Sequence, residues 1–200
     1  EIRRSADGQA WVAGQLVSPM SSQDSAVADW VFSQPELAIL GGTIRWVDEL
    51  RGTEVLELRS VDLVLRNRLL THSVRLDATP PASWGGRFTA MGRFVEPLLS
   101  RHGSDWRTWK GEAYASIDQV DLRALRPYLD WKGEVSHGTG TLRAWADIED
   151  ASVQEATLDV ALHELQLRLG ADLQPLDFPW AAGRMGLSLR DGTQEFFTRG

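Results

Sequence analysis

The stretch from Glu36 to Thr79 constrains the fold more than any other part of the chain, because it contains three extended runs in close succession. The runs are Glu36–Trp46, Val55–Asn67 and Leu70–Thr79. In the third run, one parity is apolar apart from His72 and the other is polar. This period of two is typical of a β-strand with one dry face and one solvated face. Only Arg68 and Leu69 separate the last two runs, so the pattern predicts an antiparallel hairpin.

The middle run contains a change of phase. Leu56 and Leu58 fall on one parity, whereas the three apolar residues from Val61 onward fall on the other. A single extra residue, a β-bulge near Arg59–Ser60, would return all of these side chains to one side of the strand.

A short motif occurs twice, since Gly42-Thr43-Ile44-Arg45 recurs as Gly140-Thr141-Leu142-Arg143. Apolar residues follow each copy with the same spacing, and the phase changes at the same place. In the second copy they are Val160, Leu162, Leu165, Leu167 and Leu169. The recurrence predicts internal β units at about residues 36–117 and 138–200, although chance similarity of short β segments is an alternative.

The remaining pattern is also mainly β. Further strands are expected within Gln9–Val17, Gly85–Phe94 and Trp109–Ile117, from Gly138 onward, and at Arg184–Leu189 and Glu195–Thr198. Val153–Leu169 suits a helix as well as a strand, and the repeat favours the strand. Pro175 and Pro179 are expected to bound a loop. Ser25–Phe32 and Val120–Leu129 are predicted to be two short helices.

Net charge and cysteine content exclude several functions. The net charge of −7 disfavours diffuse binding to nucleic acid or to anionic membranes. Without cysteine, the chain has no disulfide, thiolate metal site or cysteine nucleophile. It shows no signal peptide and no apolar run of membrane-spanning length. We therefore expect residues 1–200 to be a single segment of a longer chain, with any membrane anchor outside it.

The sequence contains no recognisable catalytic or metal-binding motif. Its four histidines lack the spacing of metal ligands, and His72 is expected to be a half-buried core residue. His137–Thr141 is predicted to be a turn, because it lacks the lysine and the third glycine of phosphate-binding loops. We expect no catalytic residue, metal or cofactor.

Nine tryptophans are spread along the chain. We expect most of them to pack against the sheet. Exposed rings such as Trp106 and Trp109 would instead suit a carbohydrate- or peptidoglycan-binding β module if they were coplanar on the surface. A structural spacer or partner-docking module is a third interpretation.

The run from Asp29-Trp30 through Gln34-Pro35-Glu36-Leu37 to Gly41–Glu49 resembles the AsmA-like family, and within it the YhdP type of very long Gram-negative envelope proteins. Further similar segments follow in the same order, and the resemblance covers most of residues 25 to 190. They are Leu58–Asn67, Arg75–Pro81, Trp109 with Gly111–Ala115, Gly140–Trp145 and Gly183–Met185.

The resemblance implies a fold, a location and a role. Proteins of this family are anchored in the inner membrane by an N-terminal helix and extend through the periplasm. They resemble bridge-like lipid-transfer proteins, in which repeated β units form a groove with an apolar floor. The chain is thus expected to be mainly β with two short helices, in a curved antiparallel sheet of the repeating β-groove type. The implied role is non-catalytic movement of phospholipid between the inner and outer membranes.

The expected partners follow from the same resemblance. They are phospholipid acyl chains, neighbouring repeats of the same chain and other envelope proteins, but not nucleic acid. Exposing an acyl chain of roughly fifteen carbons to water costs ~12 kcal/mol, so an apolar floor would stabilise it. An ordinary core packed against the two helices is the alternative use of these faces. The candidate floor residues are Leu70, Val74, Leu76, Ala78, Phe88, Ala90, Leu142, Ala144, Ala146 and Ile148.

Overall fold

The computed structural model describes residues 1–17, 29–98, 105–126, 134–168, 170, 172–190 and 193–199. They form one open sheet of twelve strands in the order β12-β11-β10-β9-β8-β7-β6-β5-β4-β1-β2-β3. The strands are β1 (Ile2–Arg4), β2 (Ala10–Val12), β3 (Gln15–Val17), β4 (Glu36–Asp48), β5 (Leu56–Arg68), β6 (Thr71–Thr79), β7 (Phe88–Val95), β8 (Lys110–Asp121), β9 (Glu134–Glu149), β10 (Ser152–Arg168), β11 (Leu176–Arg190) and β12 (Thr193–Arg199).

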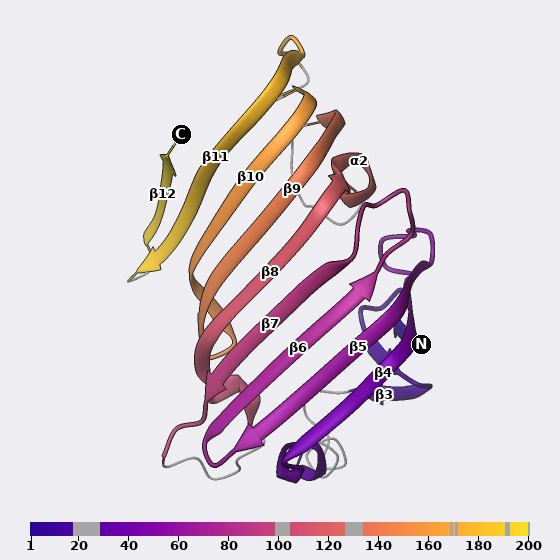
Figure 1. Ribbon diagram of the computed structural model, residues 1–200, viewed down its shortest axis with the longest axis vertical. Coiled ribbons are helices and arrows are strands. Elements are labelled where there is room, and N and C mark those ends of the chain that lie inside the picture. Colours follow the sequence, from indigo (N-terminus) through magenta and orange to yellow (C-terminus); the bar gives the residue numbers. More distant parts are fainter. Residues whose placement is uncertain are drawn as a thin grey trace.

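The sheet is antiparallel from β4 to β12, as predicted, and β1 pairs with β4 in parallel. Figure 1 shows the strands side by side in one layer, with α2 (Leu122–Leu125) at the upper ends of β8 and β9. A helix over residues 29–33 lies at the lower end of β4. The mainly β class with two short helices is therefore confirmed, and the sheet does not close on itself.

The three extended runs of the central stretch are the strands β4, β5 and β6. Arg68 pairs with Thr71, so β5 and β6 form the expected hairpin. Leu69 lies in the tight turn between them with a φ of 48°.

Both predicted phase changes are β-bulges. In β5 the register shifts between Arg59 and Asp62, and Ser60 has a φ of 47°. In β10 the register shifts between His163 and Gln166, and Glu164 has a φ of 51°. Each bulge absorbs one residue, so the apolar side chains before and after it point to the same side of the sheet.

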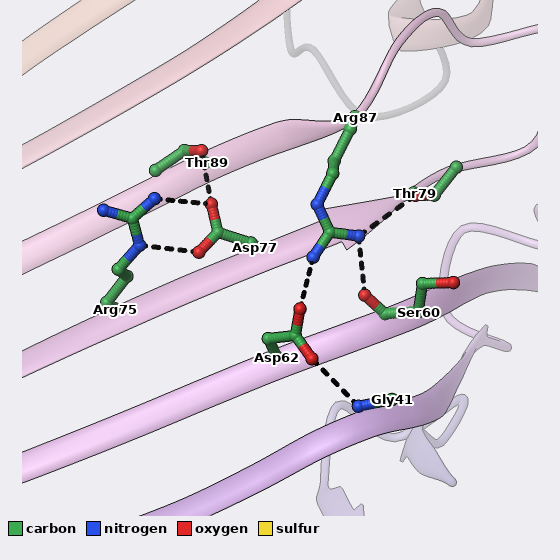
Figure 2. A network of polar contacts seen from close by, with 8 residues as sticks. All are labelled: Gly41, Ser60, Asp62, Arg75, Asp77, Thr79, Arg87 and Thr89. Carbon is green, nitrogen blue, oxygen red and sulfur yellow. Dashed lines mark hydrogen bonds and ion pairs between the residues drawn. The ribbon is translucent and has the colours of Figure 1, made fainter.

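A network of polar contacts holds the bulge in β5 (Figure 2). The Arg87 guanidinium donates to the Ser60 carbonyl at 2.7 Å and to the Asp62 carboxylate at 2.6 Å. The other Asp62 oxygen accepts from the Gly41 amide at 2.9 Å, where β4 has its own irregularity. Side chains thus form hydrogen bonds with the Ser60 carbonyl and the Gly41 amide at these two irregularities.

Because paired residues on neighbouring strands point to the same side, the register divides the sheet into two faces. We call one the apolar face. One of its cross-strand rows consists of Ile39, Leu63, Leu76, Ala90, Ala115, Ala144, Leu158 and Met185. The opposite, polar face carries the row Asp62, Asp77, Thr89, Ser116, Arg143, Asp159 and Arg184.

No second layer of described residues covers the apolar face. The chain exposes 13515 Å² of surface, whereas a compact monomer of its mass, 22.3 kDa, exposes about 9400 Å². The buried apolar residues of the described part are few: Val61, Ala78, Trp109, Val120, Leu162 and Leu165. An ordinary sealed core, the alternative use of the apolar parities, is therefore absent from this part of the chain.

Some local predictions were wrong. Gln9–Val17 is a hairpin of two strands, β2 and β3, rather than one strand. His137–Thr141 lies within β9 and is not a turn. The second helix is shorter than expected, because β8 continues to Asp121, which then caps α2 by accepting from the Arg123 amide. Residues 25–28 of the first predicted helix and residues 127–129 of the second lie outside the described residues.

The loop predicted between Pro175 and Pro179 is also wrong, since β11 already begins at Leu176. Pro179 falls between Phe178 and Trp180, which pair with Leu165 and His163. It therefore lies opposite the bulged Glu164, beyond the part of β11 that pairs with β12. A residue without an amide hydrogen is tolerated at a bulge on an unpaired edge.

Candidate functional site

The structure brings the predicted floor residues together on the apolar face. Nine of the ten lie in β6, β7 and β9 on this face, and Leu70 is half-buried in the turn before β6. Strand β8 lies between β7 and β9, so Ala115 links Ala90 to Ala144 in one row. Ala78 has no exposed surface.

Small residues line the middle of this face. Two adjacent cross-strand rows are Ala90–Ala115–Ala144 and Gly92–Ala113–Ala146–Ala156. Bulky side chains flank them in β7, where Phe88 lies on one side and Phe94 on the other. Six residues of extended chain separate these two rings, or about 20 Å. The face therefore has a band of small residues between two bulky margins, and we call this band the small-residue rows.

An apolar pocket of about 340 Å³ lies on the same face. Leu56 and Leu58 of β5 line it together with Leu158 of β10. Four strands separate β5 from β10, and in a flat sheet the two would lie about 24 Å apart. A pocket of this size reaches both only because the sheet is concave on its apolar side.

Connections between strands cover one end of this pocket. Trp84 comes from the β6–β7 connection and Leu125 comes from α2, and both line the pocket. The Asp121 amide donates to the Trp84 carbonyl at 2.9 Å, and this bond joins the two connections. A Cβ on Gly85 would lie 2.6 Å from the Gln119 carbonyl oxygen, so glycine permits the close approach of this connection to β8.

An aromatic cluster covers the opposite end of the apolar face. The His72 ring stacks on Trp109, and the edges of Phe32 meet both rings with centroids 5.4 and 4.8 Å away. The Asn67 side-chain oxygen accepts from His72 Nδ1 at 2.8 Å, and its side-chain nitrogen donates to the Val31 and Gln34 carbonyls. Asn67 thereby ties the helical segment at residues 29–33 to the sheet.

His72 is a core residue of this cluster, as predicted, but it is buried rather than half-buried. It is 4% exposed, and burial lowers the pKa of its imidazole, while the nearby Glu96 carboxylate opposes that change. The carbohydrate-binding interpretation requires Trp106 and Trp109 to be coplanar on the surface. Trp109 is instead buried against His72, whereas Trp106 is half-exposed.

Sequence reasoning missed several residues of the site. The run from Trp109 to Ile117 alternates and therefore placed Ala113 and Ala115 on one side of a strand. The alternation did not show which strands lie beside this one. Leu158 belongs to a stretch that also suits a helix. Trp84 and Leu125 come from connections, and no periodicity marks them.

The described residues include no group of three or more His, Asp or Glu side chains arranged to hold a metal ion. In the same part of the chain, no helix is both long enough and apolar enough to cross a membrane.

A comparison with protein families matches this chain over residues 1–200 to the family model described as YhdP protein. Searches of curated proteins and of solved structures give no match.

Proposed function

Since this chain belongs to the YhdP family, whose model matches residues 1–200, we propose that it is a segment of a periplasmic phospholipid conduit. Membership of this family supports a general, non-catalytic role in lipid transport in the cell envelope. The finer proposal is that phospholipid moves between the inner and outer membranes with its acyl chains against the apolar face. The segment belongs to a protein anchored in the inner membrane outside these residues.

The observation that carries the proposal is the uncovered, concave apolar face. A soluble domain normally buries such a face against a second layer. Here the apolar pocket and the small-residue rows remain accessible, and an exposed apolar surface of this extent marks a binding site.

The arrangement suits hydrocarbon chains in particular. Burying each CH₂ group contributes about 0.8 kcal/mol without any directional contact, so a chain can slide along the face at little cost. Ala90, Ala115 and Ala144 leave the space that such a chain needs, while the bulky margins keep it on the sheet.

The expected protein partners follow from the edges of the sheet. The outer edges of β3 and β12 have no partner strand among the described residues. Neighbouring repeats of the same chain would continue the ladder there and would extend the apolar face without interruption.

Photo-crosslinking of two adjacent residues tests this function. Ala144 lies on the apolar face and lines the apolar pocket, whereas Arg143 points to the polar face of the same strand. We expect a photoreactive residue at position 144 to capture phospholipid in cells and one at position 143 to capture none. Equal capture at both positions, or none at 144, would contradict the proposal.

A structural spacer is the second candidate, favoured by the long ladder of paired strands. Replacing Ala144 by Asp separates the two functions, since a spacer tolerates a charge on an unused face. Loss of envelope lipid transport with a folded protein supports the conduit, and unchanged transport supports the spacer.

A further inference from the structure

A second pocket lies beside the apolar pocket, where the β4–β5, β6–β7 and β8–β9 connections meet. Its volume is about 650 Å³, and we call it the rim pocket. Trp84 lines both pockets, so this residue lies at the boundary between them. A volume of this size lies within the range of small-molecule sites.

Two connections divide their side chains between the pockets. In α2, Arg123 lines the rim pocket and Leu125 lines the apolar pocket. Before β5, Glu54 lines the rim pocket, and Leu56 two residues later lines the apolar pocket. The surface therefore changes from charged to apolar at one boundary, as a phospholipid does between headgroup and acyl chains.

The charged side chains of the rim pocket balance each other. Arg51 and Arg123 supply two positive charges, and Glu54 and Asp121 supply two negative charges. The Arg123 guanidinium binds the Asp121 carboxylate at 2.8 Å, yet a guanidinium has five N–H donors and retains capacity for a phosphate. A balanced set of this kind suits a zwitterion better than an anion.

Hydroxyl groups add to the polar lining. Thr53 and Ser83 both line the rim pocket. Within the described part of the chain, the Thr53 hydroxyl is buried and has no hydrogen-bond partner. An unsatisfied buried hydroxyl is costly, and a phosphate oxygen that reached it would remove this cost.

The walls of the rim pocket are fixed before any ligand binds. The Arg51 amide donates to the buried Asp48 carboxylate at 3.1 Å, which holds the β4–β5 connection. The β6–β7 connection, which supplies Ser83 and Trp84, is held as well, because the Gly86 amide donates to the Asp118 carbonyl at 2.8 Å. The site is therefore preorganised, which lowers the entropic cost of binding.

We infer that the rim pocket holds the zwitterionic headgroup of a phospholipid whose acyl chain lies in the apolar pocket. Arg51 and Arg123 contact the phosphate, and Glu54 and Asp121 contact the ammonium group. This inference rests on the proposed function and adds a headgroup preference to it: phosphoethanolamine-type lipids over anionic or headgroup-free ones.

Competition between three lipids with identical acyl chains tests the inference. The purified protein is equilibrated with equal amounts of phosphatidylethanolamine, phosphatidylglycerol and diacylglycerol, and the bound lipids are quantified by native mass spectrometry. We expect phosphatidylethanolamine to exceed each of the others about tenfold. Arg51→Gln and Arg123→Gln should reduce this preference at least threefold each and leave diacylglycerol binding unchanged. Arg93→Gln, on the polar face, is the matched control and should change nothing.

The outcomes separate the two proposals. Equal binding of the three lipids by the unaltered protein overturns the headgroup inference and leaves the conduit intact. Binding of none of them overturns both. Retained diacylglycerol binding shows that a variant is folded. If a variant does not fold, the preference of the unaltered protein for phosphatidylethanolamine still decides whether the headgroup inference holds.

Discussion

The imidazole of His72 lies flat against the indole of Trp109, with ring centroids 3.9 Å apart and an angle of 5° between the planes. Both side chains are buried, and Trp109 is 4% exposed. The pair joins β6 to the start of β8 at the end of the apolar face that the helical residues 29–33 also cover.

Replacing Trp109 by Ala should lower the free energy of unfolding by about 3–5 kcal/mol, because it removes a large buried ring from this cluster. Urea titration measures the change. Trp106→Ala is the matched control, since that ring is 49% exposed, and its effect should stay below about 1 kcal/mol. Similar losses for the two variants would show that the cluster has no special role.

Acidification should weaken the same cluster. Burial lowers the pKa of His72, so the unfolded chain takes up its proton at a higher pH than the folded protein does. The contribution of neutral His72 is fully present above the ordinary histidine pKa of about 6.5 and is lost as the pH falls below it. Urea titrations between about pH 7.5 and 5.5 should show falling stability, and His72→Gln should flatten this part of the curve. An unchanged slope in His72→Gln would exclude the effect.

Two glycines at the same position of the repeated motif should respond differently to alanine. A Cβ on Gly140 would lie 2.0 Å from the Ala161 carbonyl oxygen, which is backbone and cannot turn away. The nearest atom to a Cβ on Gly42 is the Ile39 Cγ2 atom at 3.3 Å, on a side chain that can shift. We expect Gly140→Ala to lower the free energy of unfolding by about 3 kcal/mol and Gly42→Ala by less than about 1 kcal/mol. Thermal or urea unfolding of both variants checks this order.

The contacts of Asp62 with Arg87 and Gly41 should contribute measurably to stability. Asp62→Ala removes the acceptor of both donors and should lower the free energy of unfolding by about 1–2 kcal/mol. Arg59→Gln breaks an exposed ion pair with Glu57 nearby and should cost less than about 0.5 kcal/mol. If Asp62→Ala costs no more than the control, the bulge does not depend on this network.

Filling the small-residue rows should block lipid binding without adding charge. Ala115→Leu adds apolar volume to the apolar pocket and should reduce phospholipid capture at least threefold, while the protein stays folded by circular dichroism. Glu112→Leu places the same side chain on the polar face of the same strand and should leave capture unchanged. Enhanced capture by Ala115→Leu would mean that apolar area, rather than free space, limits binding.

Strand positions and bulges were predictable wherever apolar residues alternate with polar ones along the sequence. The change of phase after Leu58 located the bulge at Ser60, because a strand with one buried side cannot shift its apolar residues to the other side. The same pattern located the bulge at Glu164. Pro179 gave a wrong loop prediction, since only the three-dimensional pairing places it opposite that bulge, beyond the part of β11 that pairs with β12.

The candidate site was predictable only in part. Parity marked the apolar sides of the strands that contain Ala90, Ala115 and Ala144, but it did not show that the Ala115 strand lies between the other two, so Ala115 was missed. Trp84, Arg51 and Arg123 come from three connections that meet in space. Such meetings depend on loop conformation and on non-local contacts, which residue spacing does not encode.

From β5 to β12, each strand of the sheet pairs only with the strands before and after it in sequence. Whole hairpins can therefore be gained or lost by duplication or deletion without rearranging what remains. In the proposed conduit, every added hairpin would lengthen the apolar face by the same step and so extend the distance that the protein can span.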